Sequence, residues 1–132
     1  FSFSGLKTAV ARYVESLRAQ DQPIPAADIC ASFSEAVNDS LTAKAVQACL
    51  DTDCDTLVVG GGFSANSHLR ALAAERCAAA GITLRLPPLR YCTDNGAQIA
   101  AIGSALVRAG VAPSSLDFAP DSGMSLSQTV MP

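Results

Sequence analysis

Apolar residues recur at close to helical spacing through the first part of the chain. In the segment 4–20 this pattern predicts a helix with Ser4 as its N-cap. After the break at QPIP, a second and longer helix is predicted over about 26–51. The residues expected to form one apolar side of that helix are Ile29, Phe33, Val37, Leu41, Val46 and Leu50.

The second part of the chain alternates short apolar runs with further helices. The run DTLVVGG, residues 55–61, is continuous and bounded by glycine, which is typical of a strand buried on both faces of a parallel sheet. A helix is then predicted over about 65–80, ended by Gly81, followed by a strand over 82–86 and a helix over about 95–109. On the last helix, the residues expected on the buried side are Ile99, Ile102 and Leu106.

This order of elements predicts an α/β fold. The strand–helix–strand unit should form a right-handed parallel crossover. Two strands are too few for an independent sheet covered by helices, so the remaining strands are expected from a segment outside this chain or from a second copy. The chain opens at Phe1 without a Met, which also suggests a piece of a longer protein. We therefore expect residues 1–132 to form a single partial domain, with an irregular tail over 113–132.

Composition narrows the classes of function. The net charge is -3 and the nine basic residues are scattered, so there is no basic footprint for nucleic acid, and an RNA partner would be held mainly by other parts of an assembly. No apolar run approaches the length of a membrane span, so no membrane partner is expected. The five cysteines include no C-x-x-C pair, which favours small buried side chains in a reducing, cytoplasmic compartment.

Three consecutive glycines follow the first predicted strand. Gly60, Gly61 and Gly62 would let a phosphate or a ribose approach the backbone, beside the N–H groups of a helix N-terminus. An ordinary tight turn needs fewer glycines, so we favour a ligand site over a turn without a ligand. Asn66 lies in the first turn of the following helix. It is either the helix cap or a polar contact to a ribose or base edge.

The same turn also fits the dinucleotide fingerprint G-x-G-x-x-A, through Gly60, Gly62 and Ala65. A dinucleotide site would need an acidic residue at the end of the next strand. The sequence there reads Arg85-Leu86-Pro87. This mismatch disfavours a dinucleotide-binding half-domain.

A second candidate lies in the polar stretch before the last helix. If Asn95 is the N-cap, Gln98 takes the third helical position of a capping box and the Asp94 carboxylate stays uncommitted. Asp94 as the cap is an equal alternative. One carboxylate is not a metal site, so further ligands would come from outside this chain. With His68 as the single histidine, we assign no catalytic residue within the chain.

Three motifs occur together, in the order FSFSGLKTAV, VVGGGFSANSHLR and CTDNGAQIAAIG. In these motifs, and over about its whole length, the chain resembles the C-terminal part of the bacterial TsaD family, also called YgjD or Gcp. Archaeal and eukaryotic relatives belong to the KEOPS complex. The resemblance implies the C-terminal lobe of an actin-like and Hsp70-like ATPase fold (the ASKHA superfamily, ribonuclease H-like), with nucleotide between two lobes.

The resemblance also implies an activity and its ligands. Family members transfer threonylcarbamoyl from threonylcarbamoyl-adenylate to the tRNA adenosine beside the anticodon, and TsaB-like and TsaE-like proteins are their bacterial partners. ATP or the adenylate would be the nucleotide ligand, with Asn66, Gly61 and Gly62 as its contacts. One divalent metal per subunit, iron or zinc, would be held by Asp94 and by two histidines of an H-x-x-x-H motif, which this chain lacks.

Two other functions are weighed against the transferase. A non-catalytic, TsaB-like partner or scaffold module would keep the same fold, but the intact motifs around Asn66 and Asp94 favour the transferase. The older family name, O-sialoglycoprotein endopeptidase, implies a metalloprotease, which is disfavoured because H-E-x-x-H is absent. Because the N-terminal lobe with its phosphate-binding elements is not in this chain, we expect the chain alone to be inactive.

Overall fold

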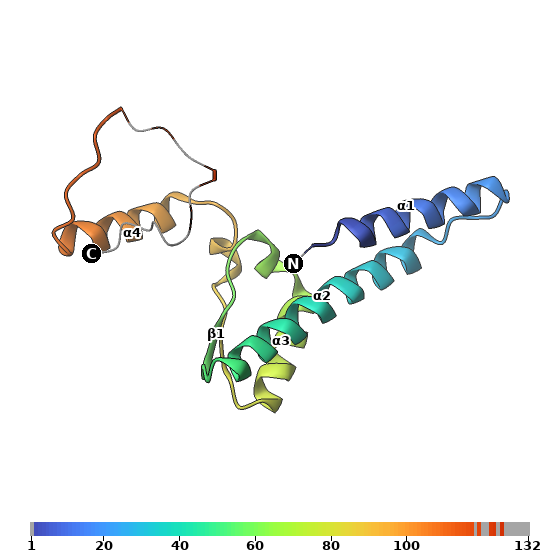
Figure 1. Ribbon diagram of the computed structural model, residues 1–132, viewed down its shortest axis with the longest axis horizontal. Helices are drawn as coiled ribbons and strands as arrows, with labels where there is room; N and C mark the ends of the chain where they lie inside the picture. Colours follow the sequence, from blue (N-terminus) through green and yellow to red (C-terminus); the bar gives the residue numbers. More distant parts are fainter. Residues whose placement is uncertain (1, 118, 120–121, 124, 126–132) are drawn as a thin grey trace. The chain divides into compact units, whose positions relative to one another are not determined.

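The structure is a computed structural model that describes residues 2–117, 119, 122–123 and 125 (Figure 1). The chain divides into two compact units, Phe1–Cys92 and Thr93–Pro132, and each is described by itself. The single partial domain therefore stays a prediction. In the predicted tail, the described residues form no helix or strand. The other tail residues lie outside the described residues.

Two helices at the start of the first unit form an antiparallel hairpin, α1 (Ser4–Ala19) and α2 (Ala26–Asp51) (Figure 1). The predicted bounds of α2 are confirmed. The prediction that Ser4 caps α1 is wrong, because helical hydrogen bonding already begins at the carbonyl of Phe3, which accepts from the Lys7 N–H at 3.0 Å. Ser4 is thus the first helical residue, and α1 has no side-chain cap.

A two-stranded parallel sheet follows, made of β1 (Thr56–Val58) and β2 (Thr83–Arg85), with Leu57 opposite Leu84. The parallel pairing confirms the prediction from the strand–helix–strand order, while the handedness of the crossover stays a prediction. The prediction that β1 is buried on both faces is wrong for this chain, since Val58 is 72% exposed. Among the described residues, no third strand or helix covers that face of the sheet.

The connecting helix α3 (Ser67–Ala79) begins two residues later than predicted. A 3₁₀ turn, η1 (Gly62–Ala65), and an extended Asn66 come first. Its end confirms the prediction for Gly81, which has φ +70°. The Gly81 N–H donates to the Ala78 carbonyl and the next N–H donates to the Cys77 carbonyl, the pair of bonds that closes a helix at a left-handed residue.

The core of the first unit lies between α2, α3 and the sheet, and its buried centre is Cys49, Cys77 and Ile82. The predicted apolar side of α2 is wrong at Leu50, which is 54% exposed. Successive helical residues point about 100° apart, so Cys49 and Leu50 cannot both face α3. Polar residues also lie on the inner side of α2, where Asn38 and Thr42 are buried.

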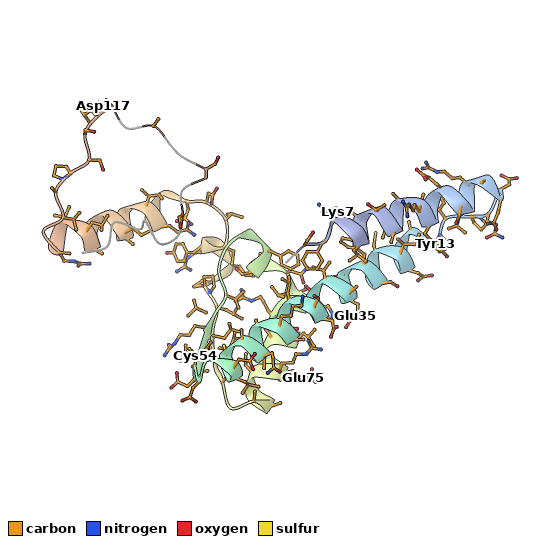
Figure 2. The ribbon with its side chains drawn as sticks, viewed as in Figure 1. Lys7, Tyr13, Glu35, Cys54, Glu75 and Asp117 are labelled. Atoms are coloured by element: carbon orange, nitrogen blue, oxygen red, sulfur yellow. The ribbon has the colours of Figure 1, made fainter. Side chains whose placement is uncertain are left out.

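Polar contacts join α2 to α3 along this core. Arg76 donates to the Asp39 carbonyl and to Thr42 Oγ1, each at 2.8 Å, and its Nη2 pairs with the Asp39 carboxylate. His68 Nε2 lies 2.6 Å from Glu35 Oε2; Figure 2 shows Glu35 on α2. These contacts fix how α3 lies on α2. The glycine turn directly precedes α3, so they also help to position that turn.

The second unit contains the helix α4 (Gly96–Arg108), close to the predicted bounds. The prediction that Ile99 and Ile102 are buried is wrong, because they are 72% and 60% exposed, and only Leu106 is half-buried. In the described part of this unit there is no second helix or strand against which these side chains could pack.

Among the described residues, no helix combines the length and the apolar character needed to cross a bilayer.

Candidate functional site

The three glycines differ in the reason each is a glycine. Gly61 has φ +85° and ψ 173°, a backbone conformation that is essentially restricted to glycine. Gly60 and Gly62 have no positive φ, and a Cβ added at either would meet no atom within 4 Å. Of these three residues, only Gly61 must be glycine, and the reason is its backbone conformation. The backbone at Gly60 and Gly62 is open to a close approach from outside.

The glycine turn is held in place by hydrogen bonds. The Ser64 side chain is buried, and its Oγ donates to the Gly61 carbonyl at 2.7 Å. Arg70, from α3, donates to the Ser64 carbonyl at 2.8 Å and to the Pro87 carbonyl at 3.1 Å. This arginine ties the turn after β1 to the segment after β2. Sequence reasoning missed it, because its two oxygen acceptors are backbone carbonyls that no motif reports.

Asn66 is the N-cap of α3, so the capping interpretation is confirmed. Its Oδ1 accepts from the Leu69 N–H at 2.9 Å. The side chain is half-buried, and within the described part of the chain its Nδ2 makes no hydrogen bond. The cap uses only the oxygen of the amide, so the nitrogen can still donate to a ligand.

An apolar pocket of about 240 Å³ lies beside the glycine turn, within the first unit. It is smaller than the 300–1,000 Å³ typical of sites that enclose a whole drug-sized ligand, so it suits one flat or apolar group of a larger molecule. Its lining comes from α2, β1, the turn and α3: Leu41, Thr42, Ala45, Leu57, Val59, Gly60, Phe63, Ser64, Leu69 and Ala73.

At the start of α4, Asn95 and not Asp94 is the helix cap. Asn95 Oδ1 accepts from the Gln98 N–H at 3.1 Å, and Asn95 Nδ2 donates to the Thr93 carbonyl at 2.8 Å. The Asp94 carboxylate is exposed and makes no hydrogen bond or ion pair with any described residue. The alternative of Asp94 as the cap is therefore wrong, and its oxygens remain available.

The predicted site residues fall in both units. Gly61, Gly62 and Asn66 lie together in the first unit, while Asp94 belongs to the second. Among the described residues, no group of three or more His, Cys, Asp or Glu side chains could hold a metal ion. Asp94 can thus supply one oxygen ligand to a metal, and the remaining ligands would come from elsewhere.

The five cysteines divide into buried and exposed side chains, and the buried Cys77 is not an activated nucleophile. Cys49, Cys77 and Cys92 are buried, as expected from the sequence, but Cys30 and Cys54 are exposed; Figure 2 labels Cys54, just after α2. Burial, together with the neighbouring Cys49, raises the pKa of the Cys77 thiol above its ordinary value. A raised pKa keeps the thiol protonated, which is the opposite of what a catalytic thiolate needs.

Comparison with known proteins decides the family. The sequence model of TsaD, described as tRNA N6-adenosine threonylcarbamoyltransferase, matches residues 1–101. The chain belongs to the TsaD family. Two relatives, both described as tRNA N6-adenosine threonylcarbamoyltransferase, are 54% identical (Corynebacterium aurimucosum) and 52% identical (Corynebacterium diphtheriae) over 126 residues. Each match covers 96% of this chain, and the chain spans 36% of the length of each relative.

Membership of the TsaD family agrees with what the chain contains. The mixed helices and parallel strands of the first unit are consistent with the α/β fold of that family. The family match extends through the glycine turn and Asn66 to Asp94 and the first residues of α4. Both candidate sites therefore lie inside the part of the sequence that relates the chain to the transferases.

Proposed function

We propose that the chain is the C-terminal segment of an enzyme that transfers threonylcarbamoyl from threonylcarbamoyl-adenylate to the tRNA adenosine beside the anticodon. The observation that carries this proposal is the 54% identity to a tRNA N6-adenosine threonylcarbamoyltransferase over 96% of the chain. In this proposal the chain forms part of the C-terminal lobe of an ASKHA-type, two-lobed ATPase fold. The enzyme works in the cytoplasm with TsaB-like and TsaE-like partners.

The glycine turn and Asn66 are proposed to form one wall of the adenylate site. The free Nδ2 of Asn66 would donate to the ribose or base of the ligand, while its Oδ1 keeps α3 capped. Gly62, where a Cβ would meet no atom of the described residues within 4 Å, lets the ligand approach the backbone, and Gly61 gives the turn its positive-φ conformation. Fixed polar groups of this kind orient a ligand without reorganisation during the reaction.

Asp94 is proposed as one ligand of a divalent metal, iron or zinc. Its exposed carboxylate, free of hydrogen bonds to the described residues, fits that role, since a metal ligand must not be committed elsewhere. When bound, such a metal would act as a Lewis acid on the threonylcarbamoyl carbonyl. Asp94 would position the ligand set and would not act as a base.

In the proposed transfer reaction, the main role of this segment is to hold the adenylate. The exocyclic amine of adenosine attacks the carbamoyl carbon and loses one proton, the bond from that carbon to the phosphate oxygen breaks, and AMP leaves with the bonding electron pair. Orienting the two reactants can account for a large part of the rate. Because the proposed opposite wall is supplied by other parts of the enzyme, we expect this chain alone to be inactive.

The test is a transfer assay with threonylcarbamoyl-adenylate and tRNA, read by mass spectrometry of the nucleosides. We expect the complete polypeptide that carries this sequence to form the modified adenosine, and the 132-residue chain alone to form none. Absence of product from the complete polypeptide with its partners would overturn the proposal. Association with a separate transferase, without transfer of its own, would instead favour the non-catalytic partner.

A further inference from the structure

One stretch of this acidic chain carries basic residues and no acidic residue. Between Glu75 and Asp94 the sequence holds three arginines, Arg76, Arg85 and Arg90, and no acidic residue, although the whole chain has a net charge of -3. Arg76 is paired with a carboxylate of α2. Arg85 and Arg90 are exposed and form no ion pair with the described residues. Two exposed arginines without an ion-pair partner among the described residues therefore lie on and after β2.

A short 3₁₀ turn after β2, η2 (Leu89–Tyr91), combines a cation with an aromatic ring. The Arg90 guanidinium lies over the Tyr91 ring, 4.7 Å from its centroid. Leu89 is 61% exposed and Tyr91 is 37% exposed. No carboxylate among the described residues pairs with Arg90, so the guanidinium over the ring presents an exposed positive charge.

Hydrogen bonds fix the backbone of this turn and of the residues on either side of it. Arg70 donates to the Pro87 carbonyl at 3.1 Å, and the Tyr91 N–H donates to the Pro88 carbonyl at 2.9 Å. The next residue, Cys92, is 1% exposed, and its N–H donates to the Leu89 carbonyl at 3.1 Å. The side chains of the turn are thus displayed from a fixed backbone, which lowers the entropy lost on binding.

We propose that Leu89–Tyr91 is a contact site for an unpaired stretch of the RNA substrate, an inference that rests on the proposed function. Arg90 would pair with a phosphate and Tyr91 would stack on a base, the combination by which proteins hold single-stranded nucleic acid. A protein partner fits less well, since Leu89 is the only aliphatic side chain of the turn and the only charge is positive.

The experiment measures the affinity of the complete polypeptide, with its partners, for unmodified tRNA at several salt concentrations. We expect Arg90→Ala to weaken binding about tenfold and to lower the salt slope by about one, as loss of one phosphate contact should. Tyr91→Leu should weaken binding about fivefold, whereas Tyr91→Phe, which keeps the ring, should change it less than about twofold.

The matched control is Arg12→Ala, which removes an exposed arginine from α1. It should change tRNA affinity less than about twofold, and unfolding curves of all variants should superimpose. In a polypeptide that still transfers threonylcarbamoyl, unchanged affinity of Arg90→Ala, or equal losses for both arginines, would overturn the contact site. Lost association with a partner protein at unchanged tRNA affinity would overturn it too. Failure of the unsubstituted polypeptide to modify tRNA would instead refute the function on which the site rests.

Discussion

At the scale of single residues, Gly61 and Gly62 are neighbours with different structural demands. Only Gly61 has a backbone conformation that a side chain would strain. We expect Gly61→Ala to lower the free energy of unfolding of the chain by about 1–2 kcal/mol. Gly62→Ala should change it by less than about 0.5 kcal/mol, since the added methyl group meets no atom. Urea unfolding followed by circular dichroism measures both, and equal losses would refute the distinction.

A substitution of Asp94 should separate metal binding from the stability of the fold. Because its carboxylate makes no hydrogen bond or ion pair with the described residues, Asp94→Asn should leave the free energy of unfolding unchanged within about 0.5 kcal/mol. In the complete polypeptide, the same change should remove most of the bound iron or zinc, measured by mass spectrometry of the metals.

The control for Asp94 is Asp21→Asn, which makes the same chemical change at an exposed aspartate after α1. Asparagine tolerates the positive φ of 52° found there. This variant should keep its metal. Full metal content in Asp94→Asn would remove Asp94 from the metal site.

At the scale of elements, Arg76 joins α3 to α2. It contacts a carbonyl, a hydroxyl and a carboxylate of α2, and its side chain is only 30% exposed. Arg76→Ala leaves these groups without their donor, so we expect the free energy of unfolding to fall by about 1–3 kcal/mol. Urea unfolding measures this loss. The exposed α1 substitution Arg12→Ala is the control, and an equally small change in both would show that these contacts do not stabilise the helix pair.

Much of the element pattern could be predicted because local signals determine it. The bounds of α2 follow from apolar spacing, and the end of α3 follows from Gly81, whose left-handed conformation ends a helix. The cap at Asn95 was one of two alternatives that the sequence left open. Sequence alone could not choose between neighbouring residues with similar capping ability, whereas the bond to the Gln98 N–H decides it.

Other features depend on contacts that sequence patterns do not report. Cys49 and not Leu50 faces the core, because α3 and the sheet pack on that side of α2. The Arg70 contacts to two loop carbonyls exist only once the sheet brings both loops together. The sequence predicted Asn66 and Asp94 as candidate site residues. Only the structure shows that the Asn66 Oδ1 caps α3, which leaves the Nδ2 of the same amide to donate to a ligand.

At the scale of the whole molecule, the chain exposes apolar surface on both units. Val58 in the first unit and Ile99 in the second are each 72% exposed. A continuous apolar run predicted burial for Val58, and helical spacing predicted it for Ile99. Neither pattern reports whether a covering element lies among the described residues. The chain spans 36% of the length of its relatives, so the activity proposed for it belongs to a larger polypeptide.

The central claim is that the glycine turn and Asn66 form a wall of an adenylate site. Calorimetric titration of the complete polypeptide with threonylcarbamoyl-adenylate tests it most directly, using Gly62→Ala and Asn66→Ser. Serine at position 66 can still cap α3 but lacks the Nδ2 donor. Alanine at position 62 meets no described atom, so both variants should unfold like the parent. We predict that each binds the adenylate at least about tenfold more weakly, the loss expected for a missing contact of about 1.4 kcal/mol. Unchanged affinity in both variants would contradict the account.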